Sequence, residues 1–359
     1  MRKKKILYFV EAFGGGVFTY LVNLTNELCD EYDIYIAYGL RKQTPKDFKK
    51  YFDKRIHLLR VQNYQRSISL LHDIRALLEM KRITNKVKPD IIHLNSSKAG
   101  ILGRFLFRNS KIPVFYTPHG YSFLMADISN KKRFFYKSLE KAFAFKNIET
   151  IACSKGEYEI TKELTSNATY VDNGVNLKEF NEIKFNHQID TNHLKIATLG
   201  RISLQKNPIL FNKIALAFPS LEFLWIGDGN LRNELTAPNI TITGWVDNKT
   251  ALKYLNGTDI FLLTSLWEGL PMALLEAMYM KKVCIVSDVV GNRDVIHNKE
   301  NGYVCSSIKQ YIKKINMIIT NKAILLPLVN KAQKNVISHY NSKIMAKQYE
   351  EIYKGSKHR

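Results

Sequence analysis

Short apolar, β-branched runs alternate with longer helix-like segments along the whole chain, and this alternation constrains the fold more than any other feature. The runs occupy residues 5–10, 34–38, 56–61, 90–94, 114–117 and 150–153 in the first half, and 195–199, 222–226, 240–242, 259–263 and 283–287 in the second. Continuous apolar runs separated by helical patterns are typical of parallel strands that crossover helices bury on both faces. The sequence therefore predicts an α/β fold in which a doubly wound parallel sheet occurs twice.

One natural boundary separates the two predicted sheets. A polar stretch with weak periodicity covers about residues 176–193, and a chain of 359 residues suits two domains of ordinary size. We expect an N-terminal domain at residues 1–176, a linker at 177–193, a C-terminal domain at 194–340 and a final helix with a tail at 341–359.

Composition restricts the kinds of partner. The 54 Lys and Arg residues exceed the 32 Asp and Glu residues, and the formal net charge is +22. This excess favours nucleic acid, an anionic membrane surface or anionic small substrates, and charge alone does not choose among them. No apolar run approaches the ~20 residues of a membrane-spanning helix, so we expect no integral membrane segment. The four cysteines lie far apart without zinc-ligand spacing, which favours core residues in a reducing cytoplasm.

Ligands of doubly wound folds bind at the carboxyl ends of the strands, so the residues at those ends are the candidates for function. Gly14–Gly16 follow the first predicted strand, and a helical pattern begins near Phe18. Glycines at such a turn let backbone amides approach an anionic ligand, although a tight turn without a ligand is nearly as consistent. The spacing fits neither a Walker A loop nor G-x-G-x-x-G.

Three further candidates end strands of the first half. His119 stands between Pro and Gly directly after a predicted strand, which favours a ligand-facing histidine over a satisfied structural one. Ser154 ends another strand, where its hydroxyl could serve a ligand or cap the next helix. Asn173 closes the half.

The second half presents cations and glycines at its strand ends. Arg201 follows Gly200 at the end of the first strand, and Lys206 lies five residues further on. Together they can neutralise a pyrophosphate, while a solvated pair on a loop is the alternative. Gly227 and Gly229 end the next strand and allow close approach of the backbone.

The segment around Glu268 and Glu276 is the richest in the chain. Glu268 lies at a strand end, and Pro271 marks the start of a helix whose first amides suit an anion. Glu276 falls inside that helix among Ala, Leu and Met. A carboxylate on an apolar helix needs a partner, and ribose hydroxyls or an ordinary salt bridge could supply it.

At this point the chain resembles the GT-B glycosyltransferases, and in particular the retaining, nucleotide-sugar-dependent family 4. Glu268 and Glu276 match the E-x7-E motif within E-G-L-P-x-x-L-L-E-A-M, and T-P-H-G around His119 also matches. The segment Asn95-Ser-Ser-Lys-Ala-Gly resembles the branch that builds bacterial capsules and exopolysaccharides. The chain departs from the family pattern at Asn207, where a glycine often stands, at Val290, which replaces one of the usual paired glycines, and at Lys281-Lys282-Val283, which replace Gly-x-Pro.

The resemblance implies a role for each matching residue. The residues implied in catalysis are His119, Arg201, Lys206 and Glu268. The residues implied in donor binding are Gly15, Gly16, Gly200, Gly227, Gly229, Gly269, Leu270, Pro271, Met272 and Glu276. Ser154 and Asn173 are implied on the acceptor side. In this scheme Arg201 and Lys206 hold the donor diphosphate, Glu276 binds the ribose, and His119 lies beside the sugar.

The resemblance also implies the architecture and the reaction. We expect two facing Rossmann-like domains with a deep interdomain cleft, and a final helix near residues 342–353 that crosses back to the first domain. The expected reaction is retaining transfer from a nucleotide-diphosphate sugar, with UDP as the expected carrier, to a lipid-linked or growing glycan acceptor in capsule polysaccharide biosynthesis. No cofactor and no metal are expected, since the chain has no D-x-D motif. Another GT-B enzyme, such as a sugar-nucleotide epimerase, is the alternative.

Residues 131–146 combine bases and aromatics at helical spacing. Such a helix can lie on an anionic bilayer or pack its aromatics on the sheet, and both readings stay open. The first reading predicts a cytoplasmic protein bound peripherally at the inner face of the cell membrane. Nucleic acid is the least favoured partner, because the chain lacks recognisable nucleic-acid-binding motifs.

Overall fold

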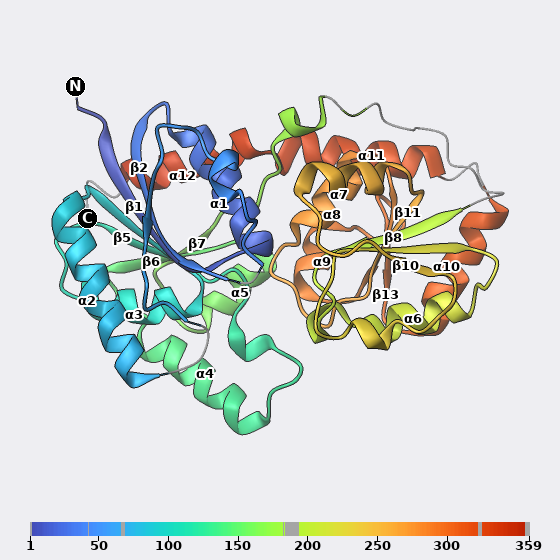
Figure 1. Cartoon of the computed structure of the whole chain (residues 1–359), viewed down its shortest axis with the longest axis horizontal. Coiled ribbons are helices and arrows are strands. Elements are labelled where there is room, and N and C mark those ends of the chain that lie inside the picture. Colours follow the sequence, from blue (N-terminus) through green and yellow to red (C-terminus); the bar gives the residue numbers. More distant parts are fainter. Residues whose placement is uncertain are drawn as a thin grey trace. The chain divides into compact units, whose positions relative to one another are not determined.

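The computed structural model describes residues 2–41, 43–65, 69–181, 183, 194–321 and 325–355. The chain divides into two compact units (Figure 1). The first comprises Met1–Leu124, Ile128–Gly174 and Ser342–Arg359, and the second comprises Met125–Asp127 and Val175–Asn341. Residues 182 and 184–193 of the expected linker lie outside the described residues, whereas its beginning, the 3-10 helix η3 (Leu177–Phe180), belongs to the second unit.

A seven-stranded parallel sheet in the order β3-β2-β1-β4-β5-β6-β7 forms the centre of the first unit. Its strands are β1 (Lys4–Phe13), β2 (Tyr32–Leu40), β3 (His57–Arg60), β4 (Ile91–Asn95), β5 (Val114–Thr117), β6 (Ile148–Ala152) and β7 (Ala168–Tyr170). Its α-helices are α1 (Gly15–Leu28), α2 (Leu70–Val87), α3 (Ser97–Phe107), α4 (Asn130–Ala142), α5 (Lys155–Lys162) and α12 (Ser342–Gly355).

Strand β1 shows why its run is apolar without interruption. Ile6, Tyr8 and Val10 belong to the core cluster that contains residues of α1 and α12, while Leu7 and Phe9 belong to the cluster that contains residues of α2 and α3. Both faces of the strand are therefore buried, as expected for a parallel sheet with helices on both sides.

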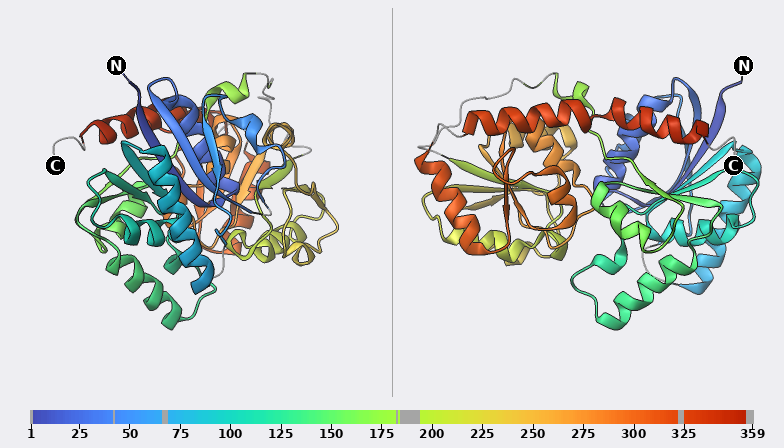
Figure 2. Two further views of the ribbon diagram at one scale, coloured as in Figure 1. Left: turned by 60° about the vertical axis from the view of Figure 1, so that its left-hand side comes forward. Right: turned by 180° about the vertical axis from the view of Figure 1, so that it is seen from behind.

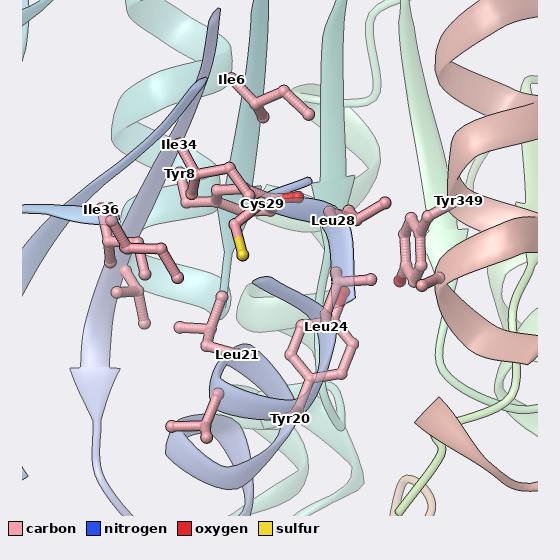
Figure 3. Packing of buried hydrophobic residues seen from close by; sticks show 14 of the residues in the cluster. Ile6, Tyr8, Tyr20, Leu21, Leu24, Leu28, Cys29, Ile34, Ile36 and Tyr349 are labelled. Atoms are coloured by element: carbon pink, nitrogen blue, oxygen red, sulfur yellow. The ribbon is translucent and has the colours of Figure 1, made fainter. Parts of the chain in front are cut away.

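The last helix, α12, is part of the first unit and packs beside α1. Figure 3 shows Tyr349 of α12 facing the side of α1 that carries Tyr20, Leu24 and Leu28. Tyr353, one turn further on, donates or accepts a hydrogen bond at 2.7 Å from Nδ1 of the buried His93 on β4. Polar groups buried in a core need hydrogen-bond partners, so this contact fixes the position of α12 on the sheet.

The second unit holds a six-stranded parallel sheet in the order β10-β9-β8-β11-β12-β13. Its strands are β8 (Lys195–Leu199), β9 (Glu222–Ile226), β10 (Ile240–Ile242), β11 (Ile260–Leu263), β12 (Val283–Ser287) and β13 (Tyr303–Cys305). Its α-helices are α6 (Pro208–Leu216), α7 (Asn248–Asn256), α8 (Met272–Tyr279), α9 (Val290–Val295), α10 (Ile308–Thr320) and α11 (Leu325–His339). A core cluster built on Trp225, Phe211 and Tyr311 fills one side of the sheet.

The prediction of two doubly wound parallel sheets is confirmed. In each sheet the strand order reverses beside the first strand of the unit, between β1 and β4 in the first sheet and between β8 and β11 in the second. Ligands of open parallel sheets bind at such switch points. The sequence missed β7 and β13, two edge strands of three residues each. The expected start of the first helix near Phe18 is wrong: α1 begins at Gly15, so Gly14 alone separates it from β1.

In the described ranges, no helix is both long enough and apolar enough to cross a bilayer.

Candidate active site

An ion pair joins the two loops that follow the central strands of the second unit. Lys206 Nζ donates to Glu268 Oε1 at 2.7 Å, and both side chains are largely buried. The loops are tied further by backbone contacts, since Leu266 N donates to Gln205 O at 2.8 Å and Gln205 Nε2 donates to Trp267 O at 3.1 Å. The structure thus brings together two predicted catalytic residues that lie far apart in the sequence.

Asn207 gives the loop the backbone conformation that a glycine would otherwise supply at this position. Its φ of 50° lies in the left-handed region, which Asn adopts at lower cost than most residues. Its side-chain oxygen also accepts a hydrogen bond from Leu210 N at 3.3 Å and caps α6. The departure from the family pattern therefore preserves the backbone that carries Lys206. Arg201 and Gly200 lie at the start of the same loop, directly after β8.

The two glycines after β9 have a packing reason to be glycine. A Cβ on Gly227 would lie 2.3 Å from Gly200 O, and its φ of +133° is unfavourable for other residues. A Cβ on Gly229 would lie 2.1 Å from Ile202 O. Contact with the neighbouring loop, rather than with a ligand, is enough to require glycine here. By contrast, nothing lies within 4 Å of a Cβ built on Gly15 or Gly16.

Glu276 is a buried acid on α8. Among the described residues it has neither a salt bridge nor a hydrogen-bond donor, so the salt-bridge alternative does not hold in that part of the chain. Burial, and secondarily the charge of Glu179, raises the pKa of Glu276 to about 8. Glu179 on η3 accepts a hydrogen bond from Asn248 Nδ2 at 2.9 Å, and burial raises its pKa as well. A carboxylate in this setting gains from hydroxyl donors of a ligand.

The residues that lead into α8 are those of the predicted donor loop. Gly269, Leu270 and Pro271 follow Glu268 without regular structure, and Met272 is the first residue of the helix. Gly291 packs against this loop, because a Cβ there would lie within 2 Å of Gly269 O. The N-terminal end of α8 is thus fixed beside the Lys206–Glu268 pair, where its amides favour negative charge.

His119 in the first unit is held by its neighbour Asn95 on β4. Asn95 Nδ2 donates to His93 O at 3.2 Å, which orients the amide, and Asn95 Oδ1 then lies 3.0 Å from His119 Nε2. The network therefore assigns the proton to Nε2 and leaves Nδ1 as a hydrogen-bond acceptor. Burial lowers the pKa of His119 to about 3. The ring of Tyr20 packs edge-on against the His119 ring, with 4.4 Å between the two ring centroids.

Ser154 takes the capping role that the sequence left open. Its hydroxyl is buried and accepts a hydrogen bond from Glu157 N at 3.1 Å, at the start of α5. Glu157 in turn accepts from Cys153 N at 2.7 Å and from Gly120 N at 2.6 Å, so it anchors the turn after His119. Asn173 is buried, and its backbone N–H donates to Cys153 O at 3.3 Å.

Sequence reasoning assigned no role to Glu157, Asn95 or Glu179. The capping-box spacing of Ser154 and Glu157 was a readable signal for the first. Asn95 gave a weaker signal, a polar residue at the carboxyl end of a strand. The proximity of Glu179 to Glu276 depends on tertiary structure and had no signal in the sequence.

Within the ranges described, no group of three or more His, Cys, Asp or Glu side chains is arranged to hold a metal ion.

Two doubly wound parallel-sheet units with these strand-end groups define the GT-B class of glycosyltransferases. Residues 14–179 match the model of the family described as Glycosyltransferase Family 4, and residues 179–339 match that described as Glycosyl transferases group 1. The chain belongs to glycosyltransferase family 4.

Individual relatives agree with this assignment. The chain is 30% identical over 324 residues to the UDP-Gal:α-D-GlcNAc-diphosphoundecaprenol α-1,3-galactosyltransferase of Escherichia coli, covering 81% of this chain and 82% of the relative. It is 23% identical to the capsular polysaccharide biosynthesis glycosyltransferase CapM of Staphylococcus aureus, with coverage of 86% and 87%. The crystal structure of Anabaena HepE in complex with UDP and glucose shares the fold, with a TM-score of 0.78, 15% identity and coverage of 98% and 100%. The prediction of a GT-B glycosyltransferase is confirmed.

Proposed function

We propose that this glycosyltransferase moves a sugar from a UDP-sugar to a saccharide on a lipid diphosphate, with retention of the anomeric configuration, during surface polysaccharide biosynthesis. The observation that carries the donor side is Glu276, a buried carboxylate without a hydrogen-bond donor among the described residues. A nucleotide ribose would supply two hydroxyl donors to it. The named activity of the Escherichia coli relative supports both the UDP-sugar donor and the lipid-diphosphate acceptor.

The expected role of the cations follows from the charge that develops during transfer. As the bond between the sugar C1 and the phosphate oxygen breaks, the leaving diphosphate gains negative charge. Lys206 Nζ, held at 2.7 Å from Glu268 Oε1, and the guanidinium of Arg201 stabilise that charge. The amides at the start of α8 act in the same direction. Because these groups supply the positive charge that a metal ion would otherwise bring to the diphosphate, we expect the reaction to proceed without a cofactor or a metal.

His119 binds a sugar hydroxyl as a hydrogen-bond acceptor and does not donate a proton in the reaction. Its Nδ1 accepts a hydrogen bond while Nε2 is engaged with Asn95 Oδ1 at 3.0 Å. The acceptor hydroxyl attacks C1 on the face from which the diphosphate leaves, and its proton passes to a departing phosphate oxygen. This sequence forms one glycosidic bond, breaks one sugar–phosphate bond and conserves the proton.

The site of action is the inner face of the cell membrane, where residues 131–146 approach anionic lipid. Phe134 and Phe135 on α4 are 76% and 50% exposed, so these two aromatics do not pack on the sheet. Several lysines surround them on the same helix, which is the composition of an interfacial helix.

A donor and acceptor screen tests the proposal. Purified protein is incubated with nucleotide sugars and with N-acetylglucosamine on a short-chain lipid diphosphate, with and without EDTA. We expect sugar transfer from one UDP-sugar, unchanged by EDTA. An epimerised nucleotide sugar formed without acceptor, or no transfer from any donor, would contradict the proposal.

A further inference from the structure

Helix α2 of the first unit exposes an apolar stripe. Leu70, Leu71, Ile74 and Leu78 are 77%, 69%, 47% and 62% exposed, and the last three follow one another at spacings of three and four residues. Such residues share one face of a helix. The opposite face is a normal core face, with Ala76 and Met80 fully buried. The helix is thus apolar on the inside and, over its first half, apolar on the outside as well.

The charges of α2 are sorted between these two faces. Both acids are engaged by the protein: Asp73 pairs with Lys98 at 2.6 Å, and Glu79 accepts hydrogen bonds from Gln62 N at 2.8 Å and Asn63 Nδ2 at 2.6 Å. The exposed bases form no ion pair with the described residues; they are Arg75, Lys81, Arg82 and Lys86. The outward face therefore combines leucines with bases that form no ion pair within the described part of the chain.

The neighbouring helices continue this surface. Residues of α2 and α3 lie in the cluster that packs on one face of the sheet, and Tyr136 of α4 packs against the same cluster. Figures 1 and 2 show the three helices on that side of the unit. The acid of α4 is also turned inward, since Glu140 forms a buried ion pair with Arg104 of α3 at 2.6 Å. Phe105 of α3 is 46% exposed.

We propose that the outer face of α2 is a second membrane-docking element, whose leucines enter the lipid while its bases contact anionic headgroups. Exposed leucines surrounded by bases, with the two acids of the helix engaged by other parts of the protein, match an anionic bilayer surface. A nucleic acid would use the bases but offers nothing to the leucines. A lipid-linked acceptor would be presented at such a surface, so this part of the argument rests on the proposed function.

Vesicle binding of the full-length protein tests the proposal. The variant L71S/I74S/L78S is compared with L216S/L326S/I337S, a control whose residues lie on α6 and α11 of the second unit and are 53%, 58% and 46% exposed. Cosedimentation uses vesicles of phosphatidylcholine with phosphatidylglycerol and vesicles of phosphatidylcholine alone. We expect the α2 variant to bind anionic vesicles about tenfold more weakly and the control to bind like the wild type.

Charge reversal and turnover complete the test. K81E/R82E should also weaken binding to anionic vesicles, and wild-type binding to neutral vesicles should be weak. Transfer to a short-chain, water-soluble acceptor should be unchanged in every variant; failure of this reaction in the wild type would contradict the proposed function without touching the vesicle result. Wild-type vesicle binding by L71S/I74S/L78S would overturn the docking proposal. So would a wild-type dimer that this variant dissociates, because the stripe would then be covered by a second copy.

Discussion

Donor binding should release a proton from Glu276. Its pKa of about 8 means that, at pH 7, roughly nine-tenths of the unliganded protein carries this carboxyl in the neutral form. Ribose hydroxyls donate most strongly to the ionised carboxylate, so the bound state favours the charged form. UDP binding at pH 7 should therefore release up to about 0.9 proton. The affinity should rise about tenfold per pH unit between pH 6 and 7 and level off above pH 8.

Isothermal titration calorimetry of UDP in phosphate and in Tris measures the proton release, since the two buffers differ in ionisation enthalpy. The matched control is Glu276→Gln, which keeps the size of the side chain and removes the proton. We expect this variant to bind UDP more weakly and with no difference between the buffers. Equal heats in both buffers for the wild type, or the same proton release in the variant, would refute the reasoning.

The same variant should be more stable than the wild type in alkaline solution. The folded protein holds the proton of Glu276 up to about pH 8, whereas the unfolded chain releases it near 4.5. Stability from this group is complete below pH 4.5 and is lost as the pH rises to 8, because the unfolded state then binds fewer protons. At pH 8 the loss amounts to about 4 kcal/mol, because the pKa is 4.5 in the unfolded chain and about 8 in the folded protein. Thermal unfolding should show Glu276→Gln gaining stability over the wild type at pH 8 and little at pH 4.

Three other substitutions have expected outcomes. Arg201→Ala should lower kcat by about a hundredfold or more with an unchanged Tm, as for loss of a charged group that stabilises the leaving group; wild-type turnover would remove Arg201 from the donor site. Asn95→Asp should raise the pKa of His119 by placing a carboxylate at Nε2, so kcat/KM should fall more steeply than in the wild type on the acidic side of neutrality. Gly227→Ala should destabilise the fold by about 2–4 kcal/mol in urea unfolding, because its Cβ would lie 2.3 Å from Gly200 O at a positive φ.

The sequence predicted the sheets well because each central strand is buried on both faces. Residues 114–117, 195–199 and 283–287 were predicted to the residue, and all are continuous apolar runs. Ala168–Tyr170 in β7 was missed because an edge strand of three half-exposed residues has no such run. The start of α1 was misplaced because glycine is a poor helix former, although α1 includes Gly15 and Gly16 in its first turn.

Tertiary structure supplies what local patterns could not about the site. Lys206 and Glu268 were each selected from strand ends, but their 2.7 Å contact depends on β8 and β11 being neighbours in the sheet. The tautomer of His119 depends on Asn95, which reaches it from the adjacent strand β4. Asn207 looked like a departure, and the structure shows it in the backbone conformation that a glycine would take.

The most direct test of the central claim is NMR analysis of the transfer product. The protein is incubated with its UDP-sugar and a short-chain lipid diphosphate that carries N-acetylglucosamine, and the new linkage is read from the anomeric proton. The account predicts one added sugar in the α configuration, the same as in the donor. A β-linked product would contradict retention, and release of the free sugar without a new linkage would contradict transfer to this class of acceptor.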